Sequence, residues 1–271
     1  MNDRTMPFFN TKDNCSLYYE TVGFQTSGPV VVFLNGTMQT AVYWKALAVR
    51  LKNRFRVLMY DARGQGQSGL GEQALSLDIH VADLVGLLGH VEVERAHLVG
   101  LSHGAKVALA SAARFPGLVD RIVLCSVGAA LSIRARLIIS SWLEILHGSG
   151  LETMAWAALP VVFGEKFLAR QGRILPTIVE AVVARNTAEA LIAHLEAVSH
   201  YPALNEIAQS VRAPCLVVSG TDDPLVTGKA AQELASLCNG RCERFAGAGH
   251  SVPAEAPGVF EQTVMQFLDT K

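Results

Sequence analysis

Continuous apolar runs alternate with segments of helical spacing along most of the chain. The run PVVVFLN at 29–35 is apolar and β-branched, the pattern of a strand buried on both faces. Residues 76–90 place leucines and valines three, four and seven positions apart, which predicts a helix with one apolar stripe. Residues 7–10 and 15–20 predict a β-hairpin. The other predicted strands are 56–61, 96–102, 121–126, 215–220 and 242–247, and the other predicted helices are 44–52, 103–115, 228–238 and 256–269.

Strands that alternate with helices predict an α/β fold, with a mostly parallel sheet flanked by helices on both faces. One interval departs from this alternation, because no convincing strand occurs between 127 and 212. That interval has a helical pattern, and we interpret it as an insertion that covers one end of the sheet. We therefore expect a core of residues 1–127 and 212–271 and a helical cap of residues 128–211. Several short helices are expected there, separated at 148–150, Pro160, Gly164, Pro176 and Pro202.

The composition allows a large hydrophobic core and argues against polyanionic partners. Half of the 271 residues are hydrophobic and 17% are charged, which suits one α/β domain. The net charge of −1 and the absence of a Lys/Arg-rich run give no basic field for nucleic acid or an anionic membrane surface. We therefore expect a small-molecule substrate as the partner, and the sequence leaves the oligomeric state undetermined.

The five cysteines and the N-terminus point to a cytoplasmic protein. Cys125 and Cys215 lie in apolar strand-like runs, where reduced thiols pack as small hydrophobes. No further ligands are spaced to complete a metal site with Cys238 and Cys242. The first ten residues do not have the pattern of a secretory signal, and no uncharged apolar stretch reaches about 18 residues. We expect free thiols, no membrane span, and neither metal nor organic cofactor.

A serine between two glycines is the first candidate for chemistry. Gly100-Leu101-Ser102-His103-Gly104 follows a predicted buried strand and begins a predicted helix. The G-x-S-x-G pattern needs small flanking residues because the strand-to-helix turn is sharp. Such a turn exposes the hydroxyl at a helix N-terminus, where unpaired N–H groups favour developing negative charge. Ser102 is therefore the candidate nucleophile, although the bare pattern also occurs as an ordinary turn.

A serine hydroxyl needs a base, and His250 is the best candidate among the eight histidines. It lies in GAGHSVPAEAP, between the last predicted strand and the last predicted helix. Gly247 and Gly249 beside it suggest a backbone shaped to aim the ring. His147, His194 and His200 fall in the predicted insertion, where packing or surface roles are expected.

The base needs a carboxylate to fix its tautomer and to stabilise the imidazolium. The strand at 215–220 ends in GTDDPLV, so Asp222 and Asp223 are both possible, and we favour Asp223. An acidic pair before proline is also ordinary turn chemistry. The resulting chain order of Ser102, Asp223 and His250 is the order of the nucleophile-elbow hydrolases.

A tetrahedral intermediate needs two donors for its negative charge. The backbone N–H of His103 is one candidate. The other is the backbone N–H of Thr37, in the loop NGTM after the strand at 29–34, where Gly36 permits close approach. Taken alone, NGTM reads as a plain turn.

The whole chain resembles the α/β-hydrolase superfamily, of the type with a helical cap between the sixth and seventh strands. The residues that carry the resemblance are NGT at 35–37, YDARGQGQSG at 60–69, GLSHG at 100–104, GTDD at 220–223 and GAGHSVPAEAP at 247–257. The resemblance implies Ser102 as nucleophile, Asp223 as acid, His250 as base, and Thr37 with His103 as the oxyanion hole. It gives a structural role to a further group, Asp61, Arg63, Gly64, Gly66 and Ser68.

One position departs from the pattern of many relatives, which carry His-Gly before the first oxyanion donor. This chain has Asn35-Gly36 there, and relatives with Asn at this position include lactone-opening enzymes. A serine nucleophile, rather than aspartate, argues against haloalkane dehalogenases and epoxide hydrolases.

We expect hydrolysis of a carboxylic ester, thioester or lactone of a small hydrophobic substrate through an acyl-enzyme. Trp142, Trp156 and Phe163 are candidate substrate contacts in the apolar insertion, although most such side chains serve to hold a cap on a sheet. Two alternatives remain: a C–C bond hydrolase or cofactor-free perhydrolase on the same triad, and a non-catalytic small-molecule receptor on the same fold.

Overall fold

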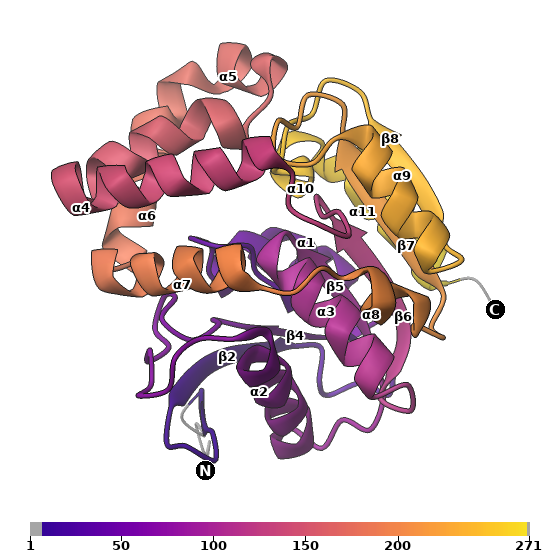
Figure 1. Cartoon of the computed structure of the whole chain (residues 1–271). Coiled ribbons are helices and arrows are strands. Elements are labelled where there is room, and N and C mark those ends of the chain that lie inside the picture. The colour runs from indigo at the N-terminus through magenta and orange to yellow at the C-terminus, as the bar shows by residue number, and fades with distance from the viewer. Residues whose placement is uncertain (1–6, 270–271) are drawn as a thin grey trace.

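An eight-stranded sheet forms the centre of the protein, with the strand order β1-β2-β4-β3-β5-β6-β7-β8 (Figure 1). The computed structural model describes residues 7–269. The hairpin strands β1 and β2 are antiparallel, as are β2 and β4, whereas the remaining neighbours pair in parallel. This confirms the mostly parallel sheet. The strands are β1 Phe8–Asn10, β2 Ser16–Val22, β3 Val30–Leu34, β4 Arg56–Tyr60, β5 Ala96–Leu101, β6 Val119–Cys125, β7 Cys215–Gly220 and β8 Arg241–Phe245.

Helices cover both faces of the sheet, which explains the continuous apolar runs. In β3, Val32 packs in a core cluster with α2, α3 and α9, while Phe33 packs on the opposite face with α1 and α11. Both side chains are fully buried. A strand covered on two sides has no solvent face and so loses the alternation of a surface strand. The core helices are α1 Lys45–Leu51, α2 Leu77–His90, α3 His103–Arg114, α9 Gly228–Leu237, α10 Val252–Glu255 and α11 Pro257–Leu268.

A helical cap is inserted between β6 and β7, as expected, and its helices α4 to α7 lie over one end of the sheet (Figure 1). The first cap helix, α4, is longer than expected from the glycine and proline residues that were predicted to separate short helices. Its break comes at Gly150, which has φ 81° and ψ 179°. Pro160 was expected to separate helices but lies within α4, which ends two residues later at Val162. The inserted helices are α4 Ile133–Val162, α5 Glu165–Gln171, α6 Leu175–Arg185, α7 Ala188–His200 and α8 Asn205–Gln209.

The cap has a small hydrophobic core of its own. Ile139 and Trp142 of α4 pack against Leu191 and Leu195 of α7. In contrast, Ala208 of α8 belongs to the main cluster beside α3, so α8 covers the sheet as a core helix does. The limits 128 and 211 of the insertion stay a prediction.

Two further observations concern the whole described chain. Within residues 7–269, no helix combines the length and the apolar character needed to cross a membrane. All five cysteines are free thiols, and Cys125 and Cys215 are buried in strands, as expected of small hydrophobes.

Candidate active site

Ser102 lies at the sharp turn between β5 and α3. Its φ of 52° and ψ of −110° are unusual for a residue with a side chain, and strain of this kind concentrates at functional positions. The Ser102 amide donates to the Cys125 carbonyl of β6 at 2.8 Å, which ties the turn to the sheet. The side chain is half-buried at the N-terminus of α3.

The glycines on either side of Ser102 are required by close backbone contacts. A Cβ on Gly100 would lie 2.4 Å from the Gly104 carbonyl oxygen, and a Cβ on Gly104 would lie 2.4 Å from the Leu34 carbonyl oxygen. No alanine fits at such distances without displacing backbone. The spacing of the G-x-S-x-G pattern therefore reflects contact between β5, α3 and β3.

Asp223 and His250 form a hydrogen-bonded pair, with His250 Nδ1 2.8 Å from Asp223 Oδ2. The second carboxylate oxygen of Asp223 accepts from the amides of Leu225 and Val226 at 2.8 and 3.0 Å. Asp223 is thus buried with both oxygens bonded. Asp222 is exposed and accepts from the Thr221 hydroxyl, so the structure brings only the second aspartate of the pair to His250.

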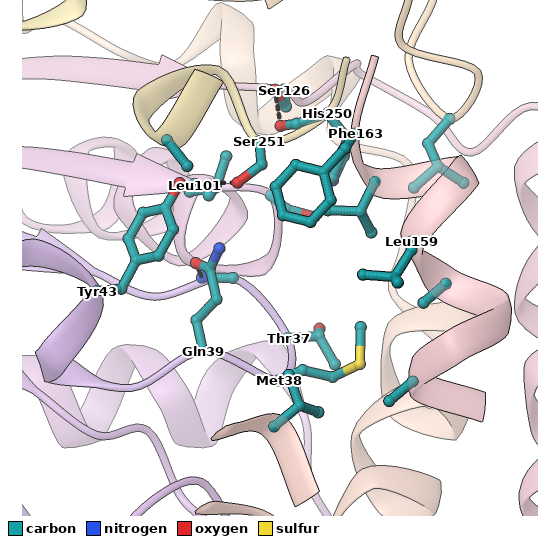
Figure 2. Close-up of a pocket in the computed structure, with 18 of the residues that line it drawn as sticks. Thr37, Met38, Gln39, Tyr43, Leu101, Ser126, Leu159, Phe163, His250 and Ser251 are labelled. Atoms are coloured by element: carbon teal, nitrogen blue, oxygen red, sulfur yellow. Dashed lines mark hydrogen bonds between the residues drawn. The ribbon is translucent and has the colours of Figure 1, made fainter. Parts of the chain in front are cut away.

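The loop that carries His250 is held by contacts that the sequence did not indicate. The amides of His250 and Ser251 both donate to the Val162 carbonyl at the end of α4, at 2.9 and 3.1 Å. The Ser126 hydroxyl donates to the His250 carbonyl at 2.6 Å (Figure 2). Ser126 follows β6 and has a positive φ of 52°. The only sequence signal for these contacts was the pair of glycines before His250.

Gly249 and Glu255 complete the attachment of this loop to the cap. A Cβ on Gly249 would lie 2.5 Å from the Gly164 amide nitrogen, so the two segments pass with no room for a side chain. The Glu255 carboxylate accepts from the amides of both Gly249 and Gly164, at 3.0 and 2.8 Å. Burial raises the pKa of Glu255, and these amide bonds oppose the rise.

The loop after β3 is attached to the neighbouring strand by a side chain. The Asn35 side-chain amide donates to the Tyr60 carbonyl at 2.7 Å, which anchors the loop to β4. The Gly36 amide is bonded to the Gln39 side chain at 2.9 Å. Thr37, but not Asn35, lines the cavity between the core and the cap. Asn35 therefore supports the loop without entering the site.

A cavity of about 580 Å³ lies between the core and the cap. Ser102, His250 and Thr37 all line it. Figure 2 shows His250 and Ser251 above Thr37 and Met38, with Phe163 and Leu159 of the cap beside them. Most of the lining is apolar, and much of it comes from α4 and α6.

Two of the three aromatic candidates for substrate contact line this cavity. Phe163 and Trp142 are part of the lining, and Trp142 also packs in the core of the cap. Trp156 is not among the lining residues, and 43% of its surface is exposed. The structure therefore does not bring Trp156 together with the other two.

Lys106 is a charged member of an otherwise mostly apolar lining. It lies one turn after Ser102 on α3 and is only 9% exposed. Burial lowers the pKa of Lys106 to about 8, and the nearby Arg136 charge acts in the same direction. Its Nζ lies 5.5 Å from the centre of the Tyr201 ring.

The segment after β4 bonds to several loops and does not line the cavity. The Asp61 carboxylate accepts from the amides of Ala41 and Gln67 at 2.6 and 2.9 Å. Arg63 pairs with the carboxylates of Asp13 and Asp83. These contacts connect loops at the end of the sheet, and the structural role implied for the segment stays a prediction.

Comparison with known proteins agrees with this architecture. A family model described as the alpha/beta hydrolase family matches residues 31–263. The chain is 27% identical over 259 residues to a putative carbamate hydrolase RutD of Caulobacter sp. (strain K31), covering 93% of this chain and 95% of the relative. It is 25% identical over 271 residues to 3-oxoadipate enol-lactonase 2 of Acinetobacter baylyi, covering 96% of this chain and 97% of the relative.

A solved structure is similar over nearly the whole length. The crystal structure of the enol-lactonase from Burkholderia xenovorans LB400 superposes with a TM-score of 0.90 at 27% identity. The match covers 97% of this chain and 100% of that chain, so the cap and the core are both shared.

Proposed function

The chain belongs to the alpha/beta hydrolase family and is a hydrolase, and from that premise we propose that it cleaves a carboxylic ester, thioester or lactone through an acyl-enzyme on Ser102. The observation that carries this proposal is the 2.8 Å bond between His250 and Asp223 beside the cavity that Ser102 lines. A base, its orienting carboxylate and an exposed hydroxyl at a helix N-terminus are the parts that acyl transfer needs.

His250 acts first as a base in this mechanism. Its Nδ1–H donates to Asp223, so the lone pair lies on Nε2, which takes the proton of Ser102 as Oγ attacks the carbonyl. The imidazolium then gives this proton to the leaving alcohol, thiol or ring oxygen. Water repeats the sequence on the acyl-enzyme and releases the acid. Asp223 stabilises the imidazolium and remains ionised throughout.

The oxyanion would be held by the backbone N–H groups of His103 and Thr37. The first lies at the start of α3, where the helix dipole adds to the stabilisation of negative charge. The second belongs to the loop that Asn35 fixes to β4. Each such donor is worth about 3 kcal/mol in the transition state.

The shape of the cavity favours a substrate with an apolar group. Side chains of α4 and α6, such as Leu159 and Ile178, form its far wall. An apolar acyl or alcohol portion would displace water from this wall, at about 25 cal/mol for each Å² buried. Phe163 and Trp142 are proposed to contact that portion, and Trp156 stays an untested candidate.

The test is a substrate panel with matched serine variants. p-Nitrophenyl esters, acyl thioesters and lactones are offered to the wild type, to Ser102→Ala, and to Ser236→Ala as a control on the exposed side of α9. We expect the control to keep full turnover and Ser102→Ala to lose it while remaining folded. A fluorophosphonate should label Ser102, as found by peptide mass spectrometry.

Each alternative has a distinct outcome when the panel is extended to a β-diketone, to hydrogen peroxide with a carboxylic acid, and to a measurement of ligand binding. Cleavage of a β-diketone, with esters left intact, would replace the proposal with C–C bond hydrolysis. Peracid formation from hydrogen peroxide and a carboxylic acid would indicate a perhydrolase. Ligand binding without steady-state turnover of any substrate would indicate a receptor, and undiminished esterase activity in Ser102→Ala would exclude the serine mechanism.

A further inference from the structure

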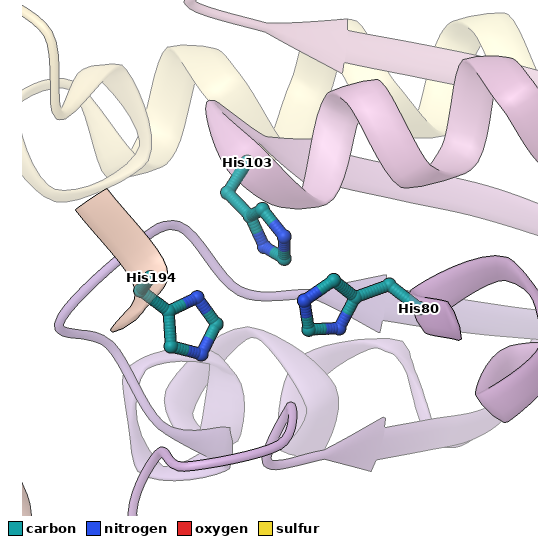
Figure 3. A group of neighbouring side chains, drawn as sticks. All are labelled: His80, His103 and His194. Atoms are coloured by element: carbon teal, nitrogen blue, oxygen red, sulfur yellow. The ribbon is translucent and has the colours of Figure 1, made fainter. Parts of the chain in front are cut away.

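Three buried histidines from separate elements meet beneath the cap. His80 lies on α2, His103 begins α3, and His194 lies on the cap helix α7. One ring nitrogen from each lies within 4.8 Å of the others, and the rings turn toward a common space (Figure 3). The three residues are 1–2% exposed. None of them lines the substrate cavity, and the proposed ester chemistry uses the backbone N–H of His103 but none of the three imidazole rings.

The cluster holds three buried nitrogens without a hydrogen-bond partner in the described part of the chain. These are His80 Nε2, His103 Nδ1 and His194 Nδ1. A buried polar atom of this kind is costly and needs an explanation, such as a bound ion or water. Three of them facing one space are stronger evidence for a ligand than any one alone.

For His194 and His103, the contact of the outer nitrogen indicates which ring atom is free to bind. His194 Nε2 is bonded to the Arg63 carbonyl. A carbonyl oxygen only accepts, so Nε2 carries the proton and Nδ1 keeps its lone pair. His103 Nε2 lies 3.1 Å from the Tyr201 hydroxyl, which can accept in the same way. Metal-ligating histidines almost always donate their second N–H to a carbonyl or a similar group.

Imidazole binds a metal ion in its neutral form, and all three rings are buried, where the charged form is disfavoured. Burial lowers the pKa of all three, and their mutual proximity adds to this for His80 and His103. The carbonyls of Arg63 and Asn35 oppose the shift for His194 and His103 respectively. The Arg63 guanidinium, which pairs with Asp13 and Asp83, lowers the pKa of His80 further.

We propose that His80, His103 and His194 bind one divalent transition-metal ion, of the class that Zn²⁺ represents. Three imidazoles and a water complete a tetrahedral shell, with zinc–nitrogen bonds of about 2.0–2.1 Å. Two ligands of such an ion lie roughly 3.4 Å apart, so the rings draw together when it binds. The ion joins α2 and α3 of the core to α7 of the cap. It thereby positions the start of α3 and stabilises the closed cap.

Metal content measures this site independently of catalysis. The wild type, His194→Gln and His200→Gln are expressed with added zinc, dialysed, and analysed by elemental mass spectrometry. His200 lies on the same helix as His194 but is exposed, so His200→Gln is the matched control. We expect about one zinc per chain in the wild type and the control, and about tenfold less in His194→Gln.

Two measurements on the wild type cover the case in which a cluster variant fails to fold. Co²⁺ in place of zinc should give the visible absorption bands of a tetrahedral site. Crystals grown from the loaded protein should show an anomalous peak between the three rings at the zinc edge. Equal zinc in the wild type and His194→Gln, or a water only between the rings, would overturn the proposal.

Lys106 carries a second and independent inference, which rests on the proposed function. Within residues 7–269, neither Lys106 nor the more exposed Arg185 forms an ion pair, and no carboxylate lines the cavity. Burying an unpaired ammonium is expensive, and a partner of opposite charge offsets that expense. We propose that Lys106 binds an anionic group of the substrate, a carboxylate or a phosphate.

The position of Lys106 limits where that group lies. Four residues separate it from Ser102 along α3, a rise of about 6 Å. The anionic group therefore lies on the α3 side of the cavity, a few bonds from the scissile carbonyl. Ile139 and Leu195 belong to the apolar lining of the same cavity, so the substrate should carry an apolar group as well as the anionic one.

The test compares an ester that bears a free carboxylate with its capped counterpart. Mono-p-nitrophenyl glutarate and its methyl ester are offered to the wild type, Lys106→Met and Lys106→Arg. We expect the ratio of kcat/KM, acid over capped ester, to fall about tenfold in Lys106→Met and to recover in Lys106→Arg.

The failure of this inference is distinct from the failure of the proposed function. Equal ratios in the wild type and Lys106→Met would overturn it while turnover still depends on Ser102. If Lys106→Met does not fold, competitive inhibition of the wild type decides. Hexanoate should inhibit at least about tenfold more strongly than hexanol, and equal inhibition would exclude an anion subsite.

Discussion

The α/β core and the helical cap bury their side chains to different degrees. In the core, β3 is buried on both faces, and backbone segments around Ser102 approach to distances that exclude a methyl group. On the cap, Ile133 and Leu137 of α4 are 79% and 63% exposed. The core therefore holds the proposed nucleophile, Ser102, in a backbone conformation that leaves it little freedom. The cap forms much of the apolar wall and leaves large apolar side chains of its own exposed.

The two regions are connected by a small set of polar contacts. The Gly66 amide donates to the Arg185 carbonyl at 3.0 Å, and the Asn186 side chain donates to the Met38 carbonyl at 3.2 Å. The His250 amide bonds to the Val162 carbonyl of the cap. The difference between core and cap can therefore be tested by single substitutions on each side.

The largest effect is expected from Asp223→Asn in the core. Asparagine preserves the shape but cannot stabilise the imidazolium and favours the wrong tautomer of His250, so kcat should fall by about 10⁴-fold. Asp222→Asn is the control, because Asp222 is exposed and its carboxylate accepts from the Thr221 hydroxyl rather than from His250. Steady-state kinetics on an ester measures both. Similar losses in the two variants would remove Asp223 from the proposed mechanism.

Gly100→Ala should destabilise the core by about 3 kcal/mol, because its Cβ would lie 2.4 Å from a backbone oxygen. Gly148→Ala in cap helix α4 is the matched substitution, since no atom lies within 4 Å of the new methyl group. That change should stabilise the protein by up to about 1 kcal/mol through helix propensity. Urea unfolding compares them, and equal effects would contradict the difference in packing.

Lys106→Met should stabilise the protein at neutral pH, since it removes a buried charge at the border of core and cap. Folding lowers the pKa of Lys106 from 10.5 to about 8, which corresponds to on the order of 3 kcal/mol. Between these values the unfolded state binds more protons, so wild-type stability rises with pH. The advantage of Lys106→Met should therefore be full below pH 8 and vanish above 10.5. Thermal unfolding of both proteins from pH 7 to 11 measures this difference in stability. A difference that does not change with pH would contradict the prediction.

The smallest effect is expected from Trp156→Ala on the outer side of the cap. Trp156 is 43% exposed and lies outside the cavity lining, so its replacement should change the free energy of unfolding by less than about 0.5 kcal/mol. Activity should remain close to that of the wild type. A large rise in KM would instead support Trp156 as a substrate contact.

The fold was largely predictable because local patterns and long-range packing agree in the core. Each predicted strand lies within two residues of an observed one, and apolar runs such as that of β3 correspond to strands covered on two faces. The cap was predicted as helical, but the length of α4 was not. The sequence around Pro160 does not distinguish a helix that ends at the proline from one that continues to Val162, as α4 does.

The candidate site was predictable where a motif encodes its own geometry. The glycines around Ser102 are required because backbone atoms approach too closely there for a side chain, so the motif itself predicts the geometry of the turn. The contacts of Val162 with the His250 loop use backbone atoms, which leave no trace in residue identity. The histidine cluster was missed for a related reason. Its members come from three elements, and only the packing of α7 on the core brings His194 to the other two.

The Val162 carbonyl has a consequence for engineering. It accepts the amides of His250 and Ser251, so the end of α4 is part of the scaffold that orients the proposed base. A chimera that receives its cap from a relative, with the aim of changing substrate preference, would also replace this acceptor. Such exchanges should retain the junction from Val162 to Gly164, or alterations in selectivity will be accompanied by misalignment of the imidazole.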